Sequence, residues 1–215
     1  MKYLTLLFIL TSTLLHSSDV NENFLKAVQL NDLEKIKSAL ASKADINTST
    51  SAGNTALLIA CRNRIAYRKI DIIEFLLSKN INVNAVDNNG VSALNISARY
   101  GDAETAKLLI DKKADIDLAD NIGTTPLMIS IYFSKNSVAV ILIENGADVN
   151  KPSKNGFTPL MAASSTGNTE MVKLLLEKNA DPSAKDNGGL DAAYLASKDE
   201  IRALLKSAIK KTKKK

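Results

Sequence analysis

The chain has 215 residues, of which 45% are hydrophobic and 24% are charged, a composition that is ordinary for a soluble protein. Its net charge of +5 does not indicate a nucleic-acid-binding surface, because six of the 28 basic residues lie in the last ten positions, and residues 19–205 hold 21 basic residues against 23 acidic ones. The only cysteine is Cys61, which excludes an intramolecular disulfide; the only histidine is His16, so removal of residues 1–18 would exclude a catalytic or metal-binding histidine.

Residues 1–18, MKYLTLLFILTSTLLHSS, have the pattern of a secretory signal peptide. Lys2 is followed by an apolar run that ends at Leu15 and then by small polar residues, and this run is too short for an ordinary membrane span. We expect cleavage after Ser17 or Ser18 and a periplasmic or secreted bacterial protein, since export without cysteine pairs fits a periplasm. An uncleaved amphipathic anchor is the alternative.

The segment after the leader is built on a repeating 33-residue template. Copies begin at Gly90, Gly123 and Gly156, and the last of them reads GFTPLMAASSTGNTEMVKLLLEKNADPSAKDNG. A fixed period of this size indicates a stacked array, in which no single repeat can bury its apolar face alone. We expect one domain over residues 19–206 and a basic tail over 207–215. The repeats, with an atypical cap at each end, lie near 20–52, 53–89, 90–122, 123–155, 156–188 and 189–206.

Each repeat carries the signals of two short helices. The first helix begins at a residue whose side chain can accept hydrogen bonds from free backbone N–H groups, namely Thr55, Ser92, Thr125, Thr158 or Asp191. The second helix ends at a position that favours positive φ, which is occupied by Lys43, Asn80, Lys113, Gly146 or Asn179. We expect the two lysines to strain or loosen their helix ends. The closing cap should keep a helix pair, and the lysines after Ala208 should fray into solvent.

The second repeat departs from the period, because Gly53 and Gly90 are 37 residues apart. Four residues are therefore inserted within RNRIAYRKI at 62–70, which brings several basic residues and Tyr67 together. Insertions in repeat proteins often lie on a binding face. A binding loop and a neutral extension, of either the loop or the first helix, are both compatible with the sequence.

The period, together with the T-P-L-x-x-A motif at 158–163, resembles the ankyrin-repeat family. The resemblance implies an all-α ankyrin-repeat solenoid of stacked helix–turn–helix repeats joined by hairpin-like loops, about six of them with the two caps. It also implies a protein that binds partners and performs no chemistry. We expect apolar or amide contacts where the histidine of the family's T-P-L-H usually links neighbouring repeats. The residues at that position are Leu58, Asn95, Met128, Met161 and Tyr194.

The hairpin-like loops that join neighbouring repeats are called fingers. Ankyrin proteins commonly bind partners with the tips of these fingers and with the exposed, concave face of the first helices. Arginine and aromatic side chains dominate interface energies, so we expect Tyr100, Tyr132 and Phe133 to cluster at the surface; Phe133 packing back into the core is the alternative. The candidate partner-binding residues are Asn54, Arg62, Asn63, Arg64, Tyr67, Asn88, Val91, Arg99, Tyr100, Asn121, Ile122, Thr124, Tyr132, Phe133, Lys154 and Phe157.

No group of residues indicates catalysis. The glycines are followed by T-P-L and not by the G-K-S of a phosphate-binding loop. The aspartates that recur with the turns, such as Asp115 and Asp117, lack the number and spacing of carboxylates that a calcium loop needs. The sequence therefore predicts no enzymatic activity, no cofactor and no metal site.

The sequence predicts a non-catalytic protein–protein interaction module or scaffold in an exported compartment. We expect a protein partner of unknown identity, no nucleic acid, no stable membrane insertion after leader cleavage, and a monomer. Small exported bacterial ankyrin proteins resemble the chain, and some of them assist periplasmic oxidative-stress enzymes, which suggests a narrower form of the hypothesis. The alternative is an electrostatic binder of membrane surfaces or polyanions that acts through the lysine tail; that tail could also be a solubilising end.

Overall fold

The computed structural model of the protein describes residues 19–67 and 70–212. The predicted signal peptide, residues 68 and 69 of the inserted stretch and the last three lysines lie outside the described residues, as do the side chains of residues 65–67 and Thr212. The chain divides into an N-terminal body that ends at Asn88 and a C-terminal body that begins at Asn89. Each body is described by itself.

Helices account for the regular structure of both bodies. The N-terminal body holds a helix over residues 19–29, α2 (Leu33–Ala41), α3 (Ala56–Tyr67) and α4 (Asp71–Leu77). The C-terminal body holds α5 (Ala93–Tyr100), α6 (Ala103–Asp111), α7 (Pro126–Tyr132), α8 (Asn136–Glu144), α9 (Pro159–Ser165), α10 (Thr169–Glu177) and α11 (Asp199–Thr212). The described residues contain isolated bridges but no strand. The predicted all-α fold of helix–turn–helix repeats is therefore confirmed.

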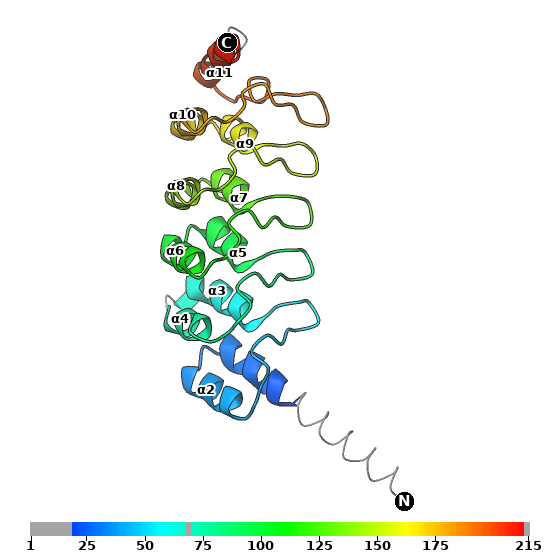
Figure 1. Ribbon diagram of the computed structural model, residues 1–215, viewed down its shortest axis with the longest axis vertical. Coiled ribbons are helices and arrows are strands. Elements are labelled where there is room, and N and C mark those ends of the chain that lie inside the picture. The colour runs from blue at the N-terminus through cyan, green and yellow to red at the C-terminus, as the bar shows by residue number, and fades with distance from the viewer. Residues whose placement is uncertain (1–18, 68–69, 213–215) are drawn as a thin grey trace, which may run out of the picture. The chain divides into compact units, whose positions relative to one another are not determined.

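The first helices of the C-terminal body form one row and the second helices another (Figure 1). Helix α5 packs against α7 and α7 against α9, while α6 packs against α8. Leu94, Leu127 and Leu160 point into this stack and are at most 1% exposed. Their burial removes the apolar face of each first helix from water, which is the main favourable contribution to stacking.

The predicted caps begin the first helices. The Ser92 and Thr125 side chains each accept a hydrogen bond at 3.2 Å from the backbone N–H three residues later, and Thr158 does so at 3.3 Å. The Asn95 side chain also accepts a bond from the Ser92 N–H at 2.8 Å, so one of the residues at the family's histidine position completes a capping box inside its own repeat.

The fingers between repeats are joined by a ladder of backbone hydrogen bonds. In the C-terminal body the N–H groups of Asn121, Lys154 and Asn187 each donate to a carbonyl of the preceding finger, over 2.9, 3.1 and 2.9 Å. The N-terminal body has the equivalent bond from Asn88 to Ala52, at 3.1 Å. These donors recur every 33 residues, so the period of the sequence is also the period of contact between fingers.

The ends of the second helices follow the expected backbone with one exception. Lys43, Lys113 and Asn179 have φ values of 66, 65 and 64°, and Gly146 has a φ of 93°. The prediction is wrong for Asn80, which has no positive φ. Instead, the N–H of Ile81 bonds the Lys79 carbonyl at 2.7 Å, so a tighter turn ends α4.

The expected loosening at the lysines does not appear in the hydrogen bonding. At the end of α6 the Lys113 N–H reaches the Ile110 carbonyl and the Ala114 N–H reaches the Leu109 carbonyl, both at 2.9 Å. The cost of placing a lysine at positive φ is therefore conformational, because the bonds of the turn are all formed.

The closing cap differs from the expected helix pair. Asp191 accepts a bond from the Tyr194 N–H at 2.8 Å, but the segment forms only turns, and a single i to i−4 backbone bond, from Leu195 to Asp191, follows the cap. The tail also differs, because α11 continues through Lys210 and Lys211 to Thr212 instead of fraying after Ala208. Half-buried Ala208 and Ile209 extend its packed face.

The inserted residues of the second repeat lengthen a helix. Helix α3 has 12 residues, whereas α5, its counterpart in the next repeat, has 8. The difference equals the four inserted residues, so the insertion adds about one helical turn before residues 68 and 69. The structure thus favours the extended first helix over an extended loop.

Asp117 is the counterpart of Asn150 in the following repeat. The Asn150 side-chain oxygen accepts a hydrogen bond from the Asp181 N–H at 2.8 Å, and the Asp117 carboxylate accepts one from the Asp148 N–H at 3.1 Å. Burial raises the pKa of the Asp117 carboxyl, and the Asp148 hydrogen bond and the Lys151 charge oppose this effect only in part.

We expect Asp117→Asn to raise the free energy of unfolding near neutral pH. A folded-state pKa above the unfolded value means that the native state binds the proton more tightly, so the associated stability is present at low pH and is lost as the pH rises through the folded pKa. Asparagine keeps the acceptor oxygen and has no charge to desolvate. Urea unfolding across pH should show a gain at neutral pH that shrinks as the pH falls through the folded pKa and is gone below the unfolded pKa. A gain that is independent of pH would contradict this explanation.

Candidate partner-binding surface

The C-terminal ends of α5 and α7 present four residues that we call the aromatic cluster: Arg99, Tyr100, Tyr132 and Phe133. Tyr100 is 49% exposed, Tyr132 61% and Phe133 37%. The Tyr132 and Phe133 rings meet edge to face, with centroids 5.3 Å apart and planes at 80°. The Arg99 guanidinium lies over the Phe133 ring, 4.4 Å from its centroid. Phe133 therefore lies at the surface and not in the core.

The position of the aromatic cluster follows from how the two helices end. Gly101, with a φ of 77°, ends α5, and its N–H bonds the Ser97 carbonyl at 2.9 Å. Phe133 ends α7, where its N–H bonds the Ile129 carbonyl at 3.0 Å. Because α5 packs against α7, these equivalent ends are neighbours, and the Arg99 guanidinium of α5 reaches the Phe133 ring; Tyr100 is exposed at the same end of α5.

The charge next to the aromatic cluster is positive. The Lys135 side chain crosses Gly101, so that a Cβ at Gly101 would lie 2.9 Å from the Lys135 Cδ. Among the residues that the structure describes, no carboxylate forms an ion pair with Arg99 or Lys135. Arg99 also lies in the last turn of α5, where a cation interacts favourably with the helix dipole.

Arg62 is the counterpart of Arg99 in the second repeat, but it is bound inside its own body. Its Nη2 donates to the Asp87 carboxylate at 2.8 Å, where the Asp87 side chain is only 7% exposed. Its Nη1 donates to the Asn54 side-chain oxygen. The two predicted binding residues Asn54 and Arg62 therefore hold a finger against α3.

The other predicted residues of the second repeat are Asn63, Arg64 and Tyr67. The Asn63 amide donates to the Val28 carbonyl at 3.0 Å and to the Gln29 carbonyl at 3.1 Å. These bonds connect α3 to the helix over residues 19–29. Arg64 is half-buried. Tyr67 is the last residue of α3, and its side chain lies outside the described residues.

The predicted finger residues are spaced along the fingers and form no compact patch. Asn88, Asn121 and Lys154 supply the backbone N–H groups of the finger ladder and keep exposed side chains. Ile122 is 67% exposed, which makes it the most exposed apolar side chain among the predicted residues whose side chains the structure describes. The remaining predicted finger residues, all half-buried, are Val91, Thr124 and Phe157.

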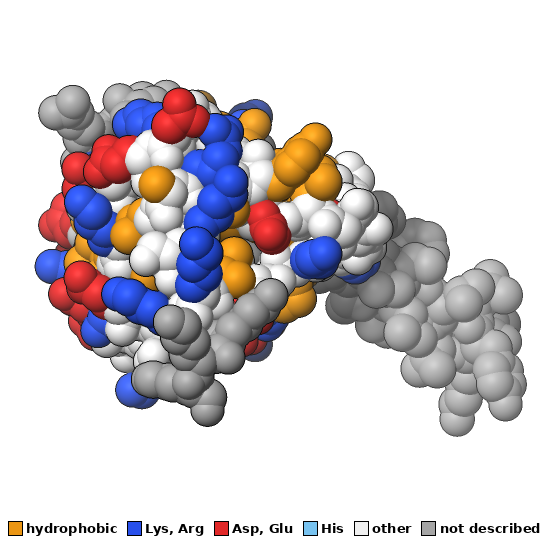
Figure 2. Space-filling view, turned by 90° about the horizontal axis from the view of Figure 1, so that it is seen from above, with side chains coloured by type: hydrophobic (Ala, Val, Ile, Leu, Met, Phe, Trp, Pro, Cys, Tyr) orange, Lys and Arg blue, Asp and Glu red, His pale blue; other side chains and the backbone are white. Residues whose placement is uncertain are grey.

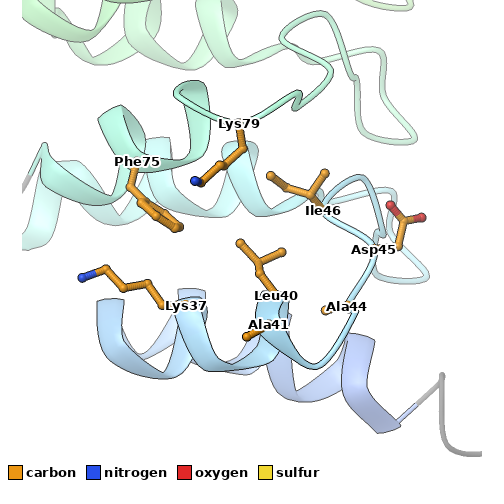
Figure 3. A pocket seen from close by; sticks show the side chains of 8 residues that line it. All are labelled: Lys37, Leu40, Ala41, Ala44, Asp45, Ile46, Phe75 and Lys79. Carbon is orange, nitrogen blue, oxygen red and sulfur yellow. The ribbon is translucent and has the colours of Figure 1, made fainter.

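Two surface features have no counterpart among the predicted residues. Tyr194 is 70% exposed, because the closing cap has no helix to pack it. A groove of about 620 Å³ lies between α2 and α4, with Leu40, Ile46 and Phe75 among its lining residues (Figure 3). The Lys79 ammonium lies 5.3 Å from the Phe75 ring centroid. No signal in the sequence predicts this groove, since it depends on how two separate repeats pack.

Helix α11 carries lysines along an exposed face. Lys206 and Lys210 are one helical turn apart and exposed, and Lys211 follows them. A row of Lys and Arg side chains crosses the face seen from above in Figure 2. The helix thus orders part of the predicted basic tail.

No group of three or more His, Cys, Asp or Glu side chains among the described residues could hold a metal ion. Cys61 is buried at 3% exposure. None of the described helices is both long enough and apolar enough to cross a membrane.

Comparison with known proteins identifies the repeats. A family model described as ankyrin repeats, three copies, matches residues 24–120, 64–152, 104–186 and 127–215. The matches together run over nearly all of the chain after the leader. A search of curated proteins finds no match to the chain.

Proposed function

The chain belongs to the ankyrin-repeat family, and from this premise we propose that it is an exported, non-catalytic module that binds a protein partner through the aromatic cluster. Ankyrin repeats indicate a protein–protein interaction module, and the exposed aromatic cluster is the observation that supports the proposed contact. Exposed aromatic residues beside an arginine are the types that contribute most to interface energies. Arg99 and Tyr132 both contact the Phe133 ring, and these contacts restrict its side chain before binding.

The proposed compartment rests on the leader. A single lysine, a short apolar run and small polar residues form the pattern of an export signal. Within that compartment, an oxidative-stress enzyme is the class of partner that resemblance to small exported ankyrin proteins suggests. Some oxidative-stress enzymes contain haem. The residues after the leader contain no histidine that could ligate a haem iron, so the protein would act on such an enzyme by binding it.

A second candidate function is supported by α11. Its exposed lysines are ordered on a helix, and the sequence continues with three more lysines. A basic helical face could bind an anionic membrane surface or another polyanion, with each lysine near the surface contributing about 1 kcal/mol. The exposed face lacks the large apolar residues that anchor an interfacial helix, so we rank this function second.

Radical footprinting of the tyrosines would distinguish the two functions. The tagged protein, expressed with its own leader, is purified free and with its captured partner, and hydroxyl-radical labelling is compared by mass spectrometry. We expect reduced labelling of Tyr100 and Tyr132 in the complex. Tyr194 is the internal control, because it is 70% exposed and belongs to the same body. Protection of Tyr194 without protection of Tyr132 would contradict the proposed surface.

A further inference from the structure

We propose that the partner segment bound at the aromatic cluster is acidic, with a carboxylate next to an apolar side chain. This inference rests on the proposed function, because it specifies the chemistry of the partner at the same surface. Three observations support it: the different environments of two equivalent arginines, the hydrogen bonds that Asp102 and Asp120 make elsewhere, and the contacts of the Phe133 ring.

The equivalent arginines differ in the groups available to them. In the second repeat, Asn54 offers a side-chain oxygen to Arg62, and the buried Asp87 carboxylate completes the pair. The counterpart of Asn54 in the third repeat is Val91, whose side chain has no acceptor atom. Arg99 therefore lacks the first of these internal partners.

The counterpart of Asp87 also forms no ion pair with Arg99. Asp120 accepts hydrogen bonds from the Ile122 N–H at 3.0 Å and the Thr124 N–H at 2.8 Å, which fixes its carboxylate in the finger turn. On the other side of Arg99, Asp102 caps α6 through the Thr105 N–H and hydroxyl. Among the described residues, no carboxylate forms an ion pair with Arg99.

A partner that covers the cluster must therefore supply the missing charge. Covering a guanidinium removes it from water, which is costly unless an anion pairs with it. A carboxylate suits it best, because the planar guanidinium can donate two parallel hydrogen bonds to its oxygens. Lys135, beside Gly101, adds a second positive charge at the same helix end. The same surface would repel a basic segment.

The rings define the apolar half of the partner segment. Phe133 is held between Arg99 and Tyr132, with its guanidinium and ring contacts at 4.4 and 5.3 Å. In the partner segment, one aliphatic or aromatic side chain would pack on the exposed ring surfaces and one carboxylate would pair with Arg99. Because the Arg99 guanidinium contacts the Phe133 ring, these two partner side chains would be one or two residues apart. The corresponding positions of the fifth repeat, Ser165 and Thr166, offer no rings, so this surface does not continue there.

Selection from a peptide library would test this inference. The purified protein is used to select from a fully random library of phage-displayed dodecapeptides, and the selected sequences are compared with the unselected library. We expect enrichment of Asp or Glu next to Leu, Ile, Phe or Tyr. For a synthetic peptide of the most enriched sequence, Arg99→Gln should weaken binding at least about tenfold, because it removes a charge-assisted pair. The control Lys107→Gln removes an exposed positive charge on α6 and should leave binding unchanged.

The outcomes separate this inference from the proposed function. Selection of apolar peptides without acidic enrichment, equally by the wild type and Arg99→Gln, would overturn the acidic chemistry and leave the surface in place. Selection of the same peptides by Tyr132→Ala/Phe133→Ala would place binding elsewhere and overturn both. No enrichment by the wild type would also overturn the inference, since a preordered cluster should select ligands. Circular dichroism spectra would confirm that each variant is folded.

Discussion

Gly123→Ala is expected to destabilise the protein more than Gly189→Ala, although both glycines open a repeat and have nearly the same backbone. Their φ values are 84 and 79°. A Cβ at Gly123 would lie 2.5 Å from the Lys154 N and 3.1 Å from two Ser153 backbone atoms, whereas a Cβ at Gly189 would meet nothing within 4 Å. The two substitutions therefore share the conformational cost and differ in the contact with the next finger.

The expected magnitudes follow from these two terms. Placing an alanine at positive φ costs about 1–2 kcal/mol, which should be the whole loss for Gly189→Ala. Gly123→Ala should lose about 1–2 kcal/mol more, because Lys154 must move and its N–H bond to the Ile122 carbonyl, at 3.1 Å, is weakened or broken. Urea unfolding followed by circular dichroism measures both values. Equal losses would mean that the finger ladder contributes nothing to stability.

Tyr132→Ala/Phe133→Ala is expected to abolish partner binding while the protein stays folded. Buried aromatic anchors at an interface commonly contribute about 2 kcal/mol or more each, so the loss of two would remove most of the affinity of an ordinary complex. The side chains are 61 and 37% exposed in the free protein, so their removal should cost little folding stability.

The matched control for this variant is Ser165→Ala/Thr166→Ala. These residues occupy the corresponding positions of the fifth repeat and are exposed. Their hydroxyls donate to the Ala162 carbonyl, at 3.0 and 2.9 Å, so they already have partners within α9. The control should bind within about twofold of the wild type if the contact is confined to the aromatic cluster. Equal losses in both variants would indicate a contact that does not depend on the rings.

The fold could be predicted because its requirements appear directly in residue types at fixed positions. Gly123 is required by its positive φ and by the close approach of Lys154, and that pair of conditions returns at Gly53, Gly90 and Gly156. Ser92 and Thr158 identify helix starts by their cap chemistry alone. Such local rules depend on few neighbours, so one sequence is enough to apply them.

The sequence could not predict features that depend on several distant residues at once. Arg62 pairs with Asp87 and also donates to the Asn54 side-chain oxygen. At the same helical position in the next repeat, Arg99 instead lies over the Phe133 ring. The closing cap kept its capping aspartate at Asp191 and still formed only turns. A cap residue starts a helix, but the helix lasts only where packing supports it.

The candidate surface was predicted in outline and refined by the structure. Tyr100, Tyr132 and Phe133 were expected to cluster at the surface; all three are exposed, but the ring contact joins only Tyr132 and Phe133, and Arg99 lies on the Phe133 ring. The residues of the second repeat received the same weight from the sequence, although Arg62 and Asn63 are occupied by internal bonds. The residues of the second repeat differ from the aromatic cluster in having internal hydrogen-bond partners. These partners can be identified only from the three-dimensional arrangement of the fingers and helices.

Side-by-side affinity capture from the source organism tests the central claim most directly. Three tagged forms, each expressed with its own leader, would be compared: the wild type, Tyr132→Ala/Phe133→Ala and a truncation that lacks 207–215. We predict that the wild type and the truncation retain the same protein at the same salt concentration and that the double variant does not. Retention by the double variant, with loss in the truncation and at high salt, would contradict the claim and favour the basic face of α11.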